Sequence, residues 1–168
     1  MEKTNILVVF DPTRDVQPAL DRAASIAALL PCTLHVFCCI HNDIPRSKDR
    51  AATVKRQLQE QRELVERAIA QLDTGDAEVT VQLEWDQDWY QAVVRASISR
   101  NVDVVLKSTY RHTTGQRVLN RTSDWTLIRE CLCPVLLVRE GSIGELEKVL
   151  AAIDIRADTD SYPRSYQR

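Results

Sequence analysis

Five short apolar runs recur along the 168-residue chain, and they constrain the fold more than any other feature of the sequence. They are rich in valine, isoleucine and leucine, which is typical of strands buried on both faces of a sheet. Segments with helical periodicity separate them. This alternation predicts an α/β domain with an open five-stranded parallel sheet and helices on both faces, a Rossmann-like architecture. The runs occupy residues 6–10, 33–40, 77–85, 102–106 and 134–138.

The helical segments are predicted from periodicity and from capping residues. In the long segment at about 46–72, apolar side chains recur at spacings of three, four and seven, which places them on one helix face. Asp15 is expected to cap a helix that begins near Pro18, and Thr122 or Ser123 to cap the last helix. The carboxylates of the run EWDQD, which precedes a further helix, are expected to cap it and to interact with its dipole.

The carboxyl ends of the predicted strands gather the residues best placed to bind a ligand. Open parallel sheets bind ligands outside these ends, where the strand order reverses. Asp11, His41 and the loop after Leu106 should meet there. Lys107 ends an otherwise apolar strand, so its ammonium must reach the crevice or find a partner such as Asp11.

The loop after Leu106 is basic and contains a single glycine, Gly115. Arginine can bind a phosphate or a carboxylate through two parallel hydrogen bonds, so one interpretation is an altered anion site. The other is that the arginines fill the crevice or form surface ion pairs with carboxylates. Four basic side chains and the single carboxylate of Asp124 give this loop a local charge of +3. The basic residues are Lys107, Arg111, Arg117 and Arg121.

Residues 1–140 are predicted to form one domain, and the segment after it has a different character. The stretch EGSIGELE is a polar linker, and KVLAAIDIRAD has the same pattern as the opening NILVVFDPTRD. Residues 141–168 are therefore interpreted as a linker and the first strand of a truncated second domain. An additional strand at the sheet edge, followed by a frayed tail, is the alternative.

Composition excludes several classes of partner. With 22 basic and 24 acidic residues, the net charge of −2 gives no reason to expect nucleic acid or an anionic membrane surface as a partner. The opening MEKTNILVVF lacks the pattern of a cleavable signal peptide, so a cytoplasmic location is expected. The five cysteines are an odd number and are interpreted as reduced thiols.

Neither a metal site nor a catalytic site is predicted. His35, Cys39 and His41 share one face of a predicted strand, but a tetrahedral site would need a ligand from a second element. Cys131 and Cys133 lie two residues apart without a partner pair, which is a weak redox signal. No serine-nucleophile, zinc-protease or Walker motif is present in the sequence.

Several segments, taken in order, resemble the universal stress protein family. They are ILVVFD, TLHVFCCI, DVVLKS and ECLCPVLLVRE, and Asp124 and Trp125 precede the last of them. The final Cys-Pro pair before an apolar strand is similar to the family's ending. The Asp-Trp pair is similar to one branch of tandem proteins. The resemblance covers residues 4 to about 140 and implies the parallel sheet described above.

The resemblance also implies where a nucleotide would bind. ATP-binding members carry three glycines and a final hydroxyl residue in the loop after the fourth strand. The matching positions here are Ser108, Arg111, Arg121 and Thr122, so only the final hydroxyl remains. Glycine lets the backbone approach a phosphate closely, and a side chain obstructs that approach. Asp11 matches an adenine-pocket residue of those members, and the implied site is therefore a degenerate nucleotide site.

Three functions follow as hypotheses. The first is a non-catalytic stress-response protein without a cofactor, which pairs through its last strand with a second domain or another copy. The second is a small-molecule binding module for an anionic or amphipathic ligand. The third is an ATP-binding domain. The candidate ligand-binding residues are Asp11, Lys107, Ser108, Arg111, Arg121 and Thr122.

Overall fold

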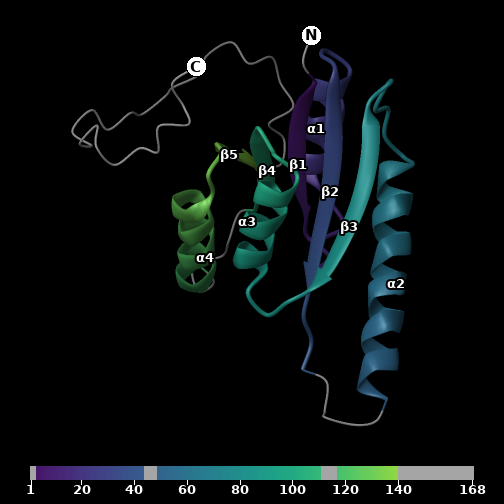
Figure 1. Ribbon diagram of the computed structural model, residues 1–168, viewed down its shortest axis with the longest axis vertical. Helices are drawn as coiled ribbons and strands as arrows, with labels where there is room; N and C mark the ends of the chain where they lie inside the picture. Colours follow the sequence, from purple (N-terminus) through teal and green to yellow (C-terminus); the bar gives the residue numbers. More distant parts are fainter. Residues whose placement is uncertain (1–2, 44–48, 111–116, 140–168) are drawn as a thin grey trace, which may run out of the picture.

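The computed structural model describes residues 3–43, 49–110 and 117–139, with only the backbone for 117–123 (Figure 1). Strands and helices alternate along these residues, as the sequence predicts. The strands are β1 (Thr4–Phe10), β2 (Cys32–Ile40), β3 (Glu78–Trp85), β4 (Val104–Thr109) and β5 (Val135–Arg139). The helices are α1 (Pro18–Ala27), α2 (Arg50–Ile69), α3 (Trp89–Ser99) and α4 (Arg117–Glu130).

The strands form one parallel sheet in the order β3-β2-β1-β4-β5, which confirms the predicted fold class. The order reverses at β1, because the chain first builds outward through β2 and β3 and then returns to place β4 on the other side. Such a reversal leaves a crevice at the carboxyl ends of β1 and β4. In the part of the chain described, no helix has the length and apolar character needed to cross a bilayer.

Strand β1 supplies side chains to two separate cores. Ile6, Val8 and Phe10 pack with residues of α1 and α2 on one face of the sheet. Leu7 and Val9 pack with residues of α3 and α4 on the other face. Figure 1 shows α3 and α4 on one side of the sheet and α2 on the other. The alternation of side chains along a strand, combined with a fully apolar run, produces this two-faced burial.

Strand β5 lies at the sheet edge and departs from the prediction of burial on both faces. Leu136 and Leu137 are 45% and 39% exposed, whereas Val138 is buried at 3%. The apolar composition of β5 does not reveal that one side of it has no neighbouring strand among the described residues. Residues 141–168 lie outside the described residues, so the predicted second-domain strand stays a prediction.

Two predictions about helix starts were wrong, and a third was confirmed in position only. Helix α1 has Gln17 rather than Asp15 at its N-cap position. Helix α4 begins at Arg117, so Thr122 and Ser123 lie within it and do not cap it. Asp88 stands at the N-cap position of α3, but its side chain makes no cap hydrogen bond. The Asp86 carboxylate accepts a hydrogen bond from the Asp88 backbone N–H at 2.9 Å.

The cap of α1 comes from a distant strand. The Ser108 hydroxyl, at the end of β4, accepts a hydrogen bond from the backbone N–H of Ala19 at 2.9 Å. Ser108 is only 2% exposed, and Ala19 is 1% exposed. This bond satisfies one of the N–H groups that a helix start leaves without an intrahelical partner. It also fixes α1 against β4.

Replacing Ser108 should therefore destabilise the fold. Ser108→Ala leaves a buried N–H without an acceptor and should lower the free energy of unfolding by about 1–3 kcal/mol in urea titration. Ser25→Ala is the matched control, because the Ser25 hydroxyl donates only to the Asp21 carbonyl within α1. Its change should stay within about 0.5 kcal/mol. Equal losses in the two variants would show that the contact of Ser108 between β4 and α1 contributes no more than a hydrogen bond within the helix.

Candidate functional site

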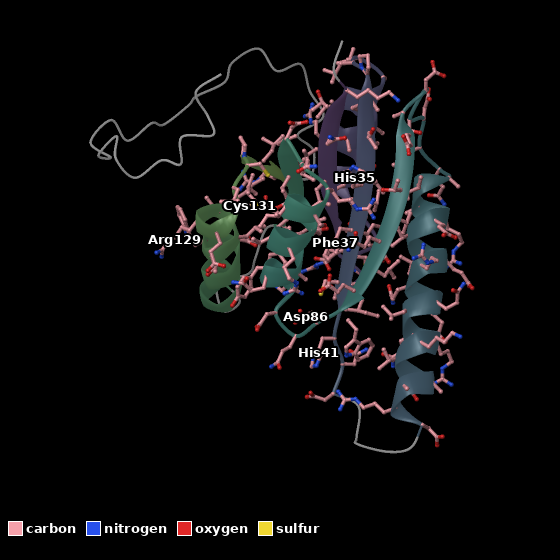
Figure 2. All side chains as sticks on the ribbon, in the orientation of Figure 1. His35, Phe37, His41, Asp86, Arg129 and Cys131 are labelled. Atoms are coloured by element: carbon pink, nitrogen blue, oxygen red, sulfur yellow. The ribbon has the colours of Figure 1, made fainter. Side chains whose placement is uncertain are left out.

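A cleft of about 740 Å³ lies at the carboxyl ends of strands β1 to β4. Its lining includes Asp11 after β1, His41 after β2, Asp86 after β3 and Lys107 in β4. Figure 2 shows His41 and Asp86 together at this end of the sheet. The prediction that Asp11, His41 and the residues after Leu106 gather at one edge is therefore confirmed.

Asp11 organises the turn that follows β1. Its Oδ1 accepts hydrogen bonds from the backbone N–H and the hydroxyl of Thr13, at 2.9 and 2.6 Å. The Gln17 side chain closes the same turn: its Oε1 accepts from the Asp11 N–H at 3.1 Å. Its Nε2 donates to the carbonyls of Asp11 and Arg14, both at 2.7 Å. Gln17 was missed in the sequence because a glutamine just before a helix has no distinctive pattern.

Lys107 lies in the cleft and is already paired. Its Nζ lies 3.1 Å from Oδ1 of Asp124 in α4 and donates to the Ser108 carbonyl at 3.1 Å. It also lies 5.1 Å from the centre of the Trp89 ring. The sequence suggested Asp11 as one partner, and the structure places Asp124 in that role. The pair is mostly buried, with the two side chains 18% and 23% exposed.

The remaining candidate residues divide between the cleft and the region after it. Ser108 lines the cleft, but its hydroxyl caps α1. Arg111 lies outside the described residues. Arg121 and Thr122 belong to the backbone of α4, one turn beyond its start at Arg117. The structure therefore brings together Asp11, Lys107 and Ser108, and the side chains of the other three are not described.

Arg14 and Tyr110 connect the two loops that border the cleft, and neither was singled out in the sequence. The Arg14 guanidinium lies 4.9 Å from the centre of the Tyr110 ring, a cation–π geometry. The Tyr110 hydroxyl donates to the Val16 carbonyl at 3.0 Å. The sequence did offer one signal for Tyr110: it is an aromatic residue directly after a strand that ends at the crevice.

The acidic residues before α3 form ion pairs with a side chain of that helix. Arg95 of α3 forms ion pairs with both Glu84 and Asp86, the latter at 2.5 Å. Hydrogen bonds from the Asp88 backbone N–H and from Arg95 hold the pKa of Asp86 below its usual range. Asp86 is therefore a carboxylate at neutral pH and adds negative charge to this side of the cleft.

His35 and Cys39 of β2 have hydrogen-bond partners within the protein. His35 Nδ1 lies 2.7 Å from the Thr80 hydroxyl, and the Cys39 thiol donates to the Asp86 carbonyl at 3.4 Å. Burial raises the pKa of Cys38 to about 12 and that of Cys39 to about 11. These two thiols are therefore protonated at neutral pH. Among the described residues, no group of three or more potential ligands could hold a metal ion.

Solved structures of other proteins share this fold at low sequence identity. A universal stress family protein from Burkholderia pseudomallei has a TM-score of 0.60 at 22% identity and covers 80% of this chain and 95% of its own. A universal stress protein in complex with cAMP has a TM-score of 0.54 at 16% identity, covering 82% and 97%. One from Archaeoglobus fulgidus in complex with dAMP has a TM-score of 0.52 at 14% identity, covering 82% and 99%.

Sequence comparison gives the family directly. The chain is 28% identical over 165 residues to universal stress protein E of Photorhabdus laumondii, covering 94% of this chain and 52% of the relative. It is also 28% identical over 161 residues to universal stress protein E of Escherichia coli K12, covering 92% and 51%. The chain thus spans about half the length of the curated relatives it matches. Because residues 3–139 match the universal stress protein family, the chain belongs to that family.

Proposed function

We propose that this chain is a non-catalytic stress-response domain that pairs through its β5 edge with a second domain of the same fold or with another copy of itself. The observation that carries the proposal is the exposed apolar surface of the edge strand, where Leu136 and Leu137 are 45% and 39% exposed. An uncovered edge strand presents backbone groups that can pair with another chain, and apolar side chains on it favour such pairing.

Further exposed apolar side chains lie close to β5 in the sequence, in α4 and in the α4–β5 connection. Trp125 and Ile128 of α4 are 60% and 38% exposed, and Leu132 in the α4–β5 connection is 63% exposed. Five of the nine large apolar side chains exposed in the described part of the chain thus fall within residues 125–137. Because apolar area removed from water stabilises an interface, this concentration favours β5 as the pairing surface.

The state of the cleft supports the proposal of a degenerate nucleotide site. The Ser108 hydroxyl already accepts the Ala19 N–H, and the Lys107 ammonium is neutralised by Asp124. A triphosphate would have to displace both contacts or bind beside them. Glu84 and Asp86 together carry one more charge than their shared partner Arg95, and this excess negative charge would oppose it further.

A second candidate function is binding of a small ligand with one anionic group. The cleft is large enough for a nucleotide-sized molecule, since ligand pockets commonly measure about 300–1,000 Å³. Lys107 and the Trp89 ring together offer a cation and an aromatic face. Two proteins of the same fold were solved with the monophosphates cAMP and dAMP. A single phosphate could exchange with Asp124 at Lys107 without a glycine cradle.

The pairing proposal predicts that a charge at Leu136 disrupts the dimer. Leu136→Lys removes the burial of a leucine, worth about 1.5–3 kcal/mol, so the dimer dissociation constant should rise about tenfold or more. Sedimentation velocity over a concentration series measures the shift. Leu29→Lys is the control, because Leu29 is 84% exposed and lies after α1. A wild-type chain that stays monomeric throughout, or an equal effect of both substitutions, would refute pairing through β5.

The ligand proposal predicts a specific order of affinities in isothermal titration calorimetry. AMP should bind the wild-type chain, and ATP should bind no more tightly, because the Ser108 hydroxyl and the Lys107 ammonium are already engaged in contacts within the protein. Asp124→Asn should strengthen AMP binding by freeing Lys107, and Lys107→Ala should abolish it.

Glu60→Gln is the control for the ligand experiment, since it removes a charge from the same cleft without freeing Lys107. ATP binding much tighter than AMP binding would contradict the degenerate site. Absence of any binding by the wild-type chain and by Asp124→Asn would eliminate the ligand function and leave the pairing proposal as the only one.

A further inference from the structure

The connection between α4 and β5 brings two thiols and a hydroxyl together, away from the cleft. Cys131 Sγ lies 3.9 Å from Cys133 Sγ and 3.6 Å from the hydroxyl oxygen of Ser97 in α3. Figure 2 shows Cys131 well apart from His41 and Asp86, which mark the cleft end of the sheet. Both cysteines are half-buried, and Leu132 between them is 63% exposed. Small solutes can therefore reach the connection.

The fold fixes this geometry from both ends. The Cys131 N–H donates to the Leu127 carbonyl at 2.9 Å, which anchors the connection to the end of α4. The Pro134 carbonyl accepts from the Val105 N–H at 2.9 Å, which anchors it to β4. Leu127 is fully buried. The two sulfur atoms are thus held near each other by the backbone rather than by chance orientation of long side chains.

The surroundings of Cys131 favour its thiolate. A hydrogen bond from the Cys133 thiol, helped by the Ser97 hydroxyl and by the backbone N–H groups of Cys133 and Leu132, lowers the pKa of Cys131 below its usual range. The Cys133 pKa is raised, chiefly because its proton is engaged with Cys131. The Ser97 hydroxyl also lies 2.8 Å from the Val94 carbonyl, so its proton can turn from that carbonyl toward the sulfur when Cys131 ionises.

We propose that Cys131 and Cys133 form a peroxide-reactive dithiol that closes reversibly to an intramolecular disulfide. The two roles differ: Cys131 is the attacking thiolate and Cys133 is the resolving thiol. The chemistry is distinct from that of Cys38 and Cys39, which are buried in or beside the sheet core and remain protonated. It also involves other atoms than the proposed pairing and ligand functions, since neither uses these sulfur atoms.

The proposed step balances with a hydroperoxide as the oxidant. The Cys131 thiolate attacks one peroxide oxygen, the O–O bond breaks, and hydroxide leaves, which gives a sulfenic acid at Cys131. Once Cys131 has lost its negative charge, it no longer holds the Cys133 proton, and the Cys133 sulfur attacks the sulfenic sulfur. The S–O bond breaks, the Cys133 proton joins the departing hydroxyl to form water, and the disulfide forms. A dithiol reductant restores both thiols by exchange, taking up the disulfide bond itself.

The expected reactivity follows from two opposing effects. While the pKa of a thiol lies above the pH, each unit of pKa lowering raises the thiolate fraction about tenfold and lowers its intrinsic nucleophilicity about threefold, so the net gain is about threefold. Cys39 has its pKa raised to about 11, so it is the internal reference. At neutral pH, iodoacetamide should modify Cys131 more than about tenfold faster than Cys39.

The test uses the whole chain, hydrogen peroxide and mass spectrometry. Tryptic cleavage after Arg129 and Arg139 yields one peptide that contains both Cys131 and Cys133. After one equivalent of peroxide, this peptide should lose two hydrogen atoms, and a dithiol reductant should restore it. In Cys133→Ser, dimedone should instead trap a sulfenic acid at Cys131.

Ser97→Ala keeps every thiol and should shift the pH midpoint of Cys131 alkylation upward, since one donor to the thiolate is lost. Ser99→Ala is its matched control, because the Ser99 hydroxyl bonds only the Ala96 carbonyl and should leave the midpoint unchanged. Two outcomes would overturn the proposal. One is a Cys131 alkylation midpoint like that of a free cysteine. The other is oxidation of Cys39 by peroxide at the same rate as oxidation of the 130–139 peptide.

Discussion

Strand β1 occupies the centre of the sheet, and the rest of the structure depends on its burial on both faces. It pairs with β2 on one side and β4 on the other. Its side chains alternate between the core under α1 and α2 and the core under α3 and α4. A strand with no exposed face must be covered by helices on both faces of the sheet. Because crossovers are right-handed, helices reach the second face only when the chain reverses the direction in which it adds strands. The cleft beside Asp11 is a consequence of this reversal.

The hydrophobic pattern predicted the five strands and their sheet correctly, although not the exposure of β5, whereas the assigned cap of α1 and the suggested partner of Lys107 were wrong. The apolar runs gave all five strands because burial on both faces leaves a plain compositional mark. The cap of α1 was assigned to nearby Asp15, whereas Ser108 provides it from 89 residues further along the chain. Likewise, Lys107 pairs with Asp124 rather than Asp11. Contacts between residues so distant in sequence arise from the tertiary fold, which periodicity and spacing do not encode.

The cleft shows how a ligand site can change while its architecture stays. Its position at the strand ends is set by topology, so it persists whatever residues surround it. Its affinity depends on which groups remain available to a ligand. Here the Ser108 hydroxyl stabilises a helix start, and Asp124 stabilises the Lys107 ammonium. Both contacts stabilise the fold, and both leave the hydroxyl and the ammonium less available to a ligand. A ligand therefore competes with the protein's own interactions, and only one able to replace them would bind well.

The α4–β5 connection joins the two surfaces on which the proposals outside the cleft rest. It carries the thiols of Cys131 and Cys133 and leads directly into the exposed leucines of β5. A disulfide there would replace a 3.9 Å sulfur contact with a covalent bond of about 2.05 Å, so one or both cysteines must shift. The buried Leu127 and Val138 hold the flanking elements in place. The shift is therefore confined to the exposed connection beside Leu132, which lies within the proposed pairing surface. Oxidation and pairing are thus coupled by position, although neither requires the other.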